Sequence, residues 1–120
     1  MINYQLDYAA GRPQMYELES RKRKAIRIIK TLADFYQGEK KLKKLSVLEI
    51  RSSTGIIDYE LSKNFKKVVG IDIDNAAVEY AKENFKSKNL KFGSQDALNL
   101  KFKKESFDIV VCAQVYEHVP

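Results

Sequence analysis

The first third of the chain carries apolar residues at a helical spacing. Between about Gln14 and Gln37 they recur every three or four positions, which is typical of an amphipathic helix. The predicted buried face consists of Ala25, Ile29, Leu32 and Tyr36, with Ile26 and Ala33 beside them. Gly38 is the expected C-terminal cap of this helix, and residues 40–44 form a linker after it.

Beyond residue 45, short apolar runs that predict strands alternate with helical segments. The predicted strands are 46–50, 67–72, 89–93 and 107–113, and the predicted helices are 57–63 and 76–85. Asn75 is the expected N-cap of the second of these helices, in which Val78, Ala81 and Phe85 share a face. The fourth strand is apolar without alternation, as expected for a parallel strand that is covered on both faces. Strands and helices that alternate in this order predict right-handed crossovers and an α/β fold with a parallel sheet.

Size and composition fit one domain of a globular protein. The chain has 120 residues, of which 44% are apolar and 32% are charged. No stretch approaches the roughly 18 consecutive apolar residues that a membrane span needs, and the N-terminus lacks the basic start and apolar run of a secretory signal. Cys112 is the only cysteine and cannot form an internal disulfide, so we expect a cytoplasmic protein with a buried, inert thiol.

The net charge of +6 lies in the N-terminal part of the chain. Residues 1–45 hold 11 Lys or Arg against 5 Asp or Glu, whereas residues 46–120 hold 11 of each kind. We therefore divide the chain into a basic helical region, 1–44, and an α/β domain, 45–120. The basic residues either form a solvated helix face and linker or attract nucleic acid. The first interpretation is favoured, because the cluster has no interleaved aromatic residues and no base-reading motif.

The ends of the predicted strands carry the candidate chemistry, because ligands of parallel α/β sheets bind beyond the carboxyl ends of the strands. The first strand runs into a turn of mostly small residues, 51–55, where bare backbone can approach a ligand. Asp72 ends the second strand, 17 residues after Gly55. Its carboxylate would accept hydrogen bonds from ribose hydroxyls or favour the N-terminus of the next helix. Asp96 follows the third strand and would bind the exocyclic amine of adenine or form an Asx-turn.

In this order, the strand-end motifs resemble those of the class I S-adenosylmethionine-dependent methyltransferases, from about residue 46 to residue 120. The family's acidic-x-Gly-x-Gly-x-Gly motif matches residues 49–55, and its acid at the end of strand two matches residues 68–74. A third motif matches Asp96-Ala97, Leu100, Phe102 and Ser106-Phe107-Asp108. Residues 114–120 look like the segment after strand four in quinone-type and other small-molecule methyltransferases.

The resemblance implies a Rossmann-like parallel sheet in the order 3-2-1-4, with flanking helices and an N-terminal helix, and S-adenosylmethionine as the cofactor. The cofactor-binding residues that it implies are Glu49, Arg51, Ser52, Thr54, Gly55, Asp72, Ile73, Asp96, Ala97, Gln114 and Val115. The residues around the first strand end would face the methionine part of the cofactor. Asp72 would hold the ribose and Ile73 would lie against the adenine, whose edge would be bound by Asp96 and Ala97. Gln114 and Val115 would line the crevice near the sulfonium.

The catalytic candidate is His118, the only histidine. It would act as a base towards a phenol or alcohol acceptor, or it would pack or cap after strand four. No metal site is expected, because one histidine and one cysteine give no cluster with ligand spacing.

The turn after the first strand departs from the family. The three loop glycines of the family fall at positions 51, 53 and 55, and only Gly55 is present. Ser53 is a small replacement. The guanidinium of Arg51 would intrude on the methionine pocket and weaken cofactor binding, swing out to solvent, or pair with Glu49 or the cofactor's carboxylate.

The predicted sheet is incomplete. The family has seven strands ordered 3-2-1-4-5-7-6, and this chain supplies four, which leaves strand four as an open apolar edge. We therefore expect a truncated piece of a longer protein, or a chain that completes its sheet in a homo-oligomer. The expected function of the full-length protein is methyl transfer to a small-molecule acceptor, with RNA as a less favoured partner. We expect this chain alone to be inactive.

Two other functions compete with methyl transfer. A catalytically inactive subunit would bind cofactor or a partner chain and complete its sheet through the strand-four edge. A nicotinamide-dependent oxidoreductase would use Asp72 for its ribose, but it needs a Gly-x-Gly-x-x-Gly turn for the pyrophosphate. No frame through residues 51–57 provides this turn, so the oxidoreductase is the less favoured of the two.

Overall fold

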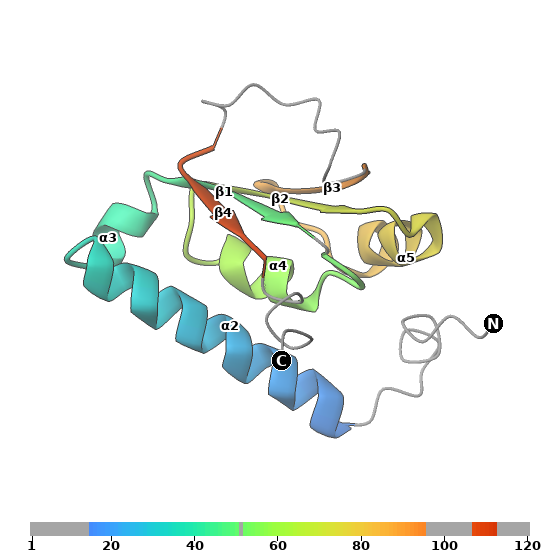
Figure 1. The fold of residues 1–120 in the computed structure, drawn as a ribbon, viewed down its shortest axis with the longest axis horizontal. Helices are drawn as coiled ribbons and strands as arrows, with labels where there is room; N and C mark the ends of the chain where they lie inside the picture. The colour runs from blue at the N-terminus through green and yellow to red at the C-terminus, as the bar shows by residue number, and fades with distance from the viewer. Residues whose placement is uncertain (1–14, 51, 96–106, 113–120) are drawn as a thin grey trace.

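The computed structural model describes residues 15–50, 52–95 and 107–112, in which helices and strands follow one another along the chain (Figure 1). The helices are α2 (Met15–Phe35), α3 (Glu39–Leu42), α4 (Ile56–Ser62) and α5 (Asn75–Asn84). The strands are β1 (Ser46–Ile50), β2 (Lys67–Asp72), β3 (Leu90–Ser94) and β4 (Ile109–Val111). The first two strands have the predicted bounds, and the other predicted elements are confirmed with shifted ends.

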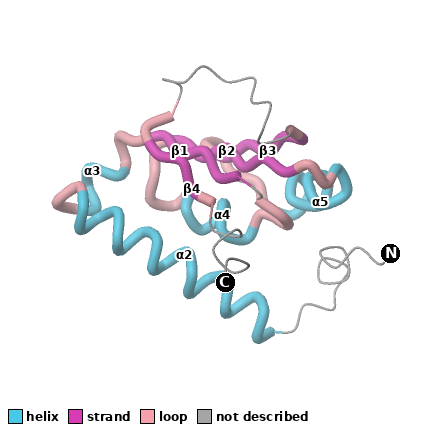
Figure 2. Tube along the Cα trace, in the orientation of Figure 1, coloured by secondary structure: helices cyan, strands magenta, loops and turns pink. Residues whose placement is uncertain are grey.

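The strands form one parallel sheet in the order β3-β2-β1-β4 (Figure 2). In the central pair, Val47 lies beside Val68 and Ile50 lies beside Ile71. Because the strands run in one direction, their carboxyl ends meet at the same edge of the sheet. The predicted parallel sheet and its order are confirmed.

Helices α2, α4 and α5 lie on one face of the sheet (Figure 1). Side chains of successive strand residues point to opposite faces. On the helical face, Val47 and Val68 are buried in a cluster that includes Ala25 and Leu61. A smaller cluster on the opposite face consists of Leu48, Val69 and Ile71, with Ile50 and Phe107 packed against it. The N-terminal helix and the sheet therefore share one core.

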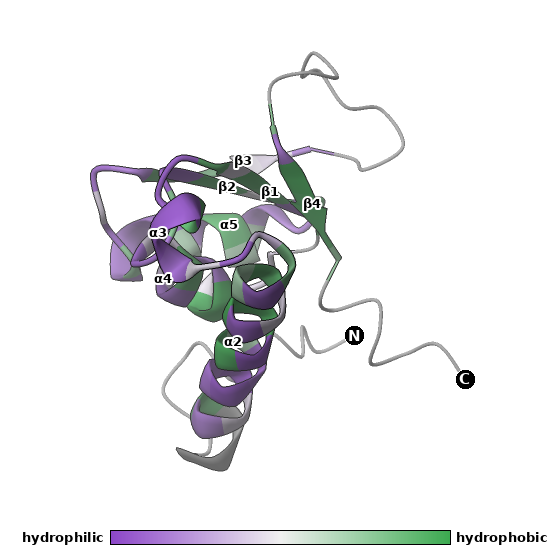
Figure 3. Cartoon of the chain, turned by 90° about the vertical axis from the view of Figure 1, so that its left-hand side faces the viewer, coloured by the Kyte–Doolittle hydropathy of each residue, from purple (hydrophilic) through white to green (hydrophobic). Residues whose placement is uncertain are grey.

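Helix α2 packs its apolar stripe against α4 and the sheet. Ala25 and Ala33 are buried, and the apolar side of the helix faces the other elements (Figure 3). The prediction that Ile26 lies beside this stripe is wrong, because Ile26 is 59% exposed. Ile28 packs against the core instead. It is three residues after Ala25 and thus on the same side of the helix, whereas Ile26 is turned away.

The end of α2 differs in detail from the prediction. Gln37 has the left-handed backbone conformation, with φ 62°, and the amide of Gly38 donates a 2.8 Å hydrogen bond to the carbonyl of Ala33. This arrangement is a Schellman-type cap in which Gln37 takes the left-handed position expected of glycine. The predicted linker 40–44 contains part of the short helix α3.

Helix α5 is capped by Asp74, and the prediction of Asn75 as the cap is wrong. The Oδ1 atom of Asp74 accepts hydrogen bonds from the amides of Ala76 at 3.0 Å and Ala77 at 3.2 Å. These two amides have no partner within the first turn, so the side chain stabilises the helix start. The predicted face of α5 is confirmed: Val78 and Ala81 are buried, and Phe85 packs against the core.

Strand β4 lies at the edge of the described sheet and pairs with β1. Val110 is 57% exposed, so the expected burial of this strand on both faces is wrong for the described residues. None of the helices in the described ranges is long and apolar enough to cross a membrane.

Candidate cofactor site

The turn between β1 and α4 is buried and tightly folded. The amide of Ser52 donates to the carbonyl of Ile71 at 2.8 Å, and the amide of Gly55 donates to the carbonyl of Ser52 at 3.0 Å. Ser53 and Gly55 both have positive φ, 56° and 90°. Such values favour glycine, so the serine at position 53 is under backbone strain. The turn therefore has the shape of a glycine-rich loop although it has only one glycine.

Gly55 is required by its surroundings as well as by its φ. A Cβ atom at this position would lie 2.7 Å from Cζ of Phe92 and 2.9 Å from Cβ of Ala81. The absence of a side chain thus lets the start of α4 approach β3 and α5 closely. This contact places the turn against the carboxyl edge of the sheet.

Asp72 ties this turn to the end of β2. Its Oδ2 atom accepts a 2.9 Å hydrogen bond from the amide of Ser53, and its Oδ1 atom accepts a 2.9 Å hydrogen bond from the amide of Asp74. The side chain is almost buried, at 6% exposure. Ile73, the next residue, is 71% exposed although it is a large apolar residue. The structure therefore brings Ser52, Thr54, Gly55, Asp72 and Ile73 to one edge of the sheet.

Two carboxyl groups are buried together below this turn. Glu49 of β1 and Asp58 of α4 are both fully buried, and their carboxyl groups lie within hydrogen-bonding reach of each other. Burial and the neighbouring charge of Asp58 raise the pKa of Glu49 well above its usual range. Burial raises the pKa of Asp58 to about 8. The pair therefore holds at least one proton at pH 7, because two buried carboxylates in contact repel each other.

Several oxygen atoms of the carboxyl pair and of the turn after β1 lack hydrogen-bond donors among the described residues. No donor among the described residues serves the four carboxyl oxygens of Glu49 and Asp58, and the hydroxyls of Ser52 and Ser53 are likewise buried without a hydrogen bond there. A shared proton lets the two carboxyl groups bond to each other. The remaining acceptors are suited to a donor that arrives with a ligand.

Gly70 in β2 makes room for Asp58. A Cβ atom at Gly70 would lie 2.8 Å from Oδ2 of Asp58 and 2.8 Å from Cβ of Ser52. The sequence patterns did not predict Asp58 as a site residue. A signal was present, because Asp58 lies between Ile57 and Leu61 on the apolar face of a short helix, where a carboxyl group is unusual.

Several predicted site residues lie outside the described residues. They are Arg51, Asp96, Ala97, Gln114, Val115 and His118.

Comparison with known proteins identifies the family. Residues 47–120 match the family described as "Methyltransferase domain". The chain is 30% identical over 81 residues to the ubiquinone biosynthesis O-methyltransferase of Coxiella burnetii, with 66% of this chain and 35% of that protein covered. It is 33% identical over 82 residues to the demethylmenaquinone methyltransferase of Lactococcus lactis, with 63% and 32% covered. Among solved structures, the PH0226 protein from Pyrococcus horikoshii is similar, with 29% identity, a TM-score of 0.62, and 78% and 42% of the two chains covered.

The chain belongs to the class I S-adenosylmethionine-dependent methyltransferases. The cofactor of this family is S-adenosylmethionine. This chain spans about a third of the length of the curated relatives that it matches. Two features of the described residues suit this cofactor: buried carboxyl oxygens without donors would accept hydrogen bonds from a cationic amino group, and an exposed apolar side chain follows the carboxylate at the end of β2.

Proposed function

We propose that this chain forms the cofactor-binding part of a methyltransferase that transfers a methyl group from S-adenosylmethionine to a small-molecule acceptor. The observation that carries the proposal is the hydrogen bond between Asp72 and the amide of Ser53. It joins the turn after β1 to the end of β2, and this is the edge of the sheet where nucleotides bind in such folds. The cofactor supplies a methyl group that is activated by the positive sulfur, so the protein mainly aligns the reactants and excludes water.

Each described residue has a proposed role. Glu49 and the backbone from Ser52 to Gly55 face the amino-acid part of the cofactor. Asp72 binds the ribose: each of its oxygens already accepts one backbone hydrogen bond and keeps a second lone pair for a hydroxyl group. The exposed side chain of Ile73 packs against the adenine.

Residues beyond the described ranges complete the proposal. Asp96 and Ala97 bind the adenine edge, and Gln114 and Val115 line the crevice near the sulfonium. His118 acts as the base towards a hydroxyl acceptor. Two of the relatives, which are named for ubiquinone biosynthesis and for demethylmenaquinone, support a small-molecule acceptor.

Calorimetric titration with S-adenosylmethionine and S-adenosylhomocysteine tests the cofactor site. We expect both to bind, and NADH not to bind. Asp72→Asn should weaken binding at least about tenfold, because the amide nitrogen cannot accept a hydrogen bond from a ribose hydroxyl. Asp74→Asn is the matched control, since asparagine also caps a helix and the variant should bind as the parent does.

The variant Arg51→Gly distinguishes a cofactor site that the arginine side chain blocks from a chain that has no cofactor site. Binding that appears only in this variant identifies the arginine as the obstacle. If neither the parent chain nor the variant binds either ligand, the proposed cofactor site is wrong.

The exposed edge of the sheet favours a second candidate role, in which the chain completes its sheet with a second copy of itself. Strand β4 pairs with β1, and Val110 is 57% exposed. Beside it, an apolar groove of about 440 Å³ lies between β4 and α2 and includes Ile28, Leu32 and Val111. Light scattering should then give the mass of a dimer, which Val110→Lys converts to a monomer. A monomeric parent chain at all concentrations contradicts this role.

A further inference from the structure

We propose that Asp58 and Glu49 form a carboxyl pair that receives the ammonium group of the cofactor's amino-acid part, and that docking of this group releases a proton from the pair. This inference rests on the proposed function and extends it to a residue of α4 that lies outside the family's loop motif.

The geometry of the pair is the first argument. Glu49 reaches the site from the sheet and Asp58 from the first turn of α4, and both are fully buried. Gly70 leaves the volume that the carboxyl group of Asp58 fills, with 2.8 Å between its Oδ2 atom and the place of the absent Cβ. The carboxyl group of Asp58 is thus seated by the sheet itself, close to Ser52 of the turn.

The unsatisfied atoms are the second argument. Six buried oxygen atoms belong to the pair and the adjoining turn, namely the four carboxyl oxygens of the pair and the hydroxyls of Ser52 and Ser53. Apart from a proton shared within the pair, none has a hydrogen-bond partner among the described residues. Two buried carboxyl groups without donors destabilise a fold, whereas apolar side chains of similar volume would not. An ammonium group has three donors and a positive charge, so it would both satisfy and neutralise these acceptors.

The charges around the pair are the third argument. From α2, the positive charge of Arg21 lowers the pKa of Glu49, and from β2 the negative charge of Asp72 raises it. Burial and Asp58 outweigh Arg21, so the pKa of Glu49 remains raised. A second positive charge from the ligand would shift this balance towards the ionised pair, and the displaced proton would go to solvent.

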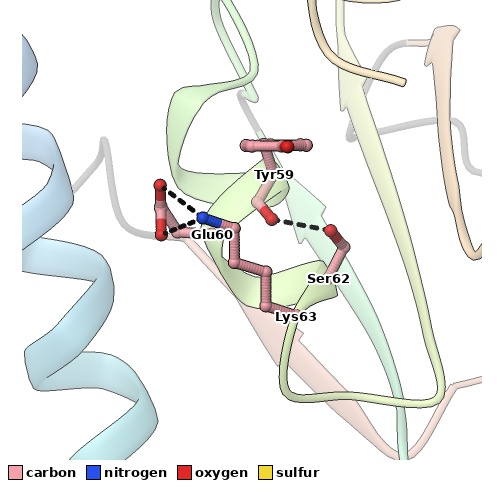
Figure 4. A network of polar contacts seen from close by, with 4 residues as sticks. All are labelled: Tyr59, Glu60, Ser62 and Lys63. Atoms are coloured by element: carbon pink, nitrogen blue, oxygen red, sulfur yellow. Dashed lines mark hydrogen bonds and ion pairs between the residues drawn. The ribbon is translucent and has the colours of Figure 1, made fainter. Parts of the chain in front are cut away.

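A second acidic residue of α4 provides a matched control. Glu60 lies two residues after Asp58, and both of its carboxyl oxygens accept hydrogen bonds from Nζ of Lys63, at 3.2 and 3.3 Å (Figure 4). This carboxylate is paired with a lysine, and its side chain is 18% exposed. Glu60→Gln therefore changes the charge of α4 without touching the buried pair.

The test counts protons during binding. Titration calorimetry at pH 7 in two buffers with different ionisation enthalpies gives the number of protons released. The probes are S-adenosylhomocysteine, which has the amino-acid part, and 5′-methylthioadenosine, which lacks it. We expect about one proton released with the first and about none with the second, and an affinity for the first that rises up to about tenfold for each pH unit between pH 6 and 8.

Variants separate the proposed role from a structural one. Asp58→Asn should weaken binding of S-adenosylhomocysteine about tenfold, reduce the proton release, and leave binding of 5′-methylthioadenosine unchanged. Glu60→Gln should behave as the parent chain. A purely structural role of Asp58 would weaken binding of both probes equally, and that result would overturn the inference.

Other outcomes are also decisive. Binding of both probes without proton release, or without preference for the amino-acid part, refutes the inference and leaves the proposed function standing. Failure of both probes to bind to the parent chain and to Arg51→Gly refutes the proposed function and the inference with it. If Asp58→Asn does not fold, the proton count and the pH dependence of the parent chain still decide between these outcomes.

Discussion

The buried pair of Glu49 and Asp58 predicts that this chain loses stability as the pH rises through neutrality. Both pKa values are raised on folding, so the folded chain binds more protons than the unfolded chain. The stabilisation from these protons is complete below the ordinary carboxyl pKa values, near 4, and is lost as the pH approaches the value of about 8 given for Asp58. The expected loss therefore falls between about pH 5 and pH 8.

The magnitude follows from proton linkage. Each proton that the folded pair holds and the unfolded chain does not hold lowers the free energy of unfolding by about 1.4 kcal/mol for each pH unit. One such proton gives a fall of about 3 kcal/mol between pH 5.5 and pH 7.5. Total stabilities of such domains are only about 5–15 kcal/mol, so this loss lowers the melting temperature by roughly 10 °C.

Urea denaturation followed by circular dichroism measures this slope. The double variant Glu49→Gln, Asp58→Asn keeps the shape of both side chains and removes both titrating groups. It should lose the slope that the parent chain owes to the pair, and Asp58→Asn alone should lose part of it. His118 is present in each protein, so its titration cancels in the comparison.

If the free energy of unfolding changes with pH equally in the parent chain and the double variant, the proposed titration of the pair is refuted. This result would mean that the carboxyl groups of Glu49 and Asp58 titrate normally in the folded chain. Titration of the carboxyl carbons by NMR checks the same point on the parent chain, without any substitution.

Three further predictions concern the turn after β1 and its surroundings, each checked by the free energy of unfolding. Gly55→Ala should destabilise the chain by about 3 kcal/mol, because its φ is 90° and its Cβ would lie 2.7 Å from Phe92. The control Gly93→Ala should change little, since no atom lies within 4 Å of a Cβ there. Ser53→Gly should stabilise the chain by about 1 kcal/mol by relieving the strain of φ 56°, whereas Ser53→Ala keeps that strain and should stabilise it less. Asp74→Ala should cost about 1 kcal/mol through loss of the α5 cap, with little change in affinity for S-adenosylhomocysteine. If Gly55→Ala leaves the free energy of unfolding unchanged, or if Ser53→Gly is no more stable than Ser53→Ala, the proposed role of the positive φ angles in this turn is wrong.

The sheet was predictable because its signals are local. The apolar runs 46–50 and 67–72 are bounded by polar residues and turns, and the structure has strands with these bounds. Helix ends were less predictable. Gln37 has the left-handed conformation after α2 although Gly38 follows it, and Asp74 is the N-cap of α5 although Asn75 follows it. At each of these helix ends two neighbouring residues are of a suitable type, and the sequence does not indicate which of them takes the position.

The carboxyl pair could not be derived from local patterns. Its environment depends on three elements that meet only in the folded chain: Glu49 in β1, Asp58 in α4, and Gly70 in β2. The register of the sheet decides that Gly70 lies beside Glu49. The motif after the first strand indicates Glu49, whereas no motif or periodicity within α4 alone indicates that Asp58 lies beside it.

The hydrogen bond from the amide of Ser53 to Asp72 also has a consequence for biosynthesis. Its two residues are only 19 positions apart, and the strands that it connects enclose a single short helix. The loop to be closed is small, so its entropic cost is modest, and the β1-α4-β2 unit can form before β3 and β4 have left the ribosome. The turn after β1 would then be among the earliest parts of the α/β unit to become ordered, and later strands would add to a unit whose carboxyl edge is already formed.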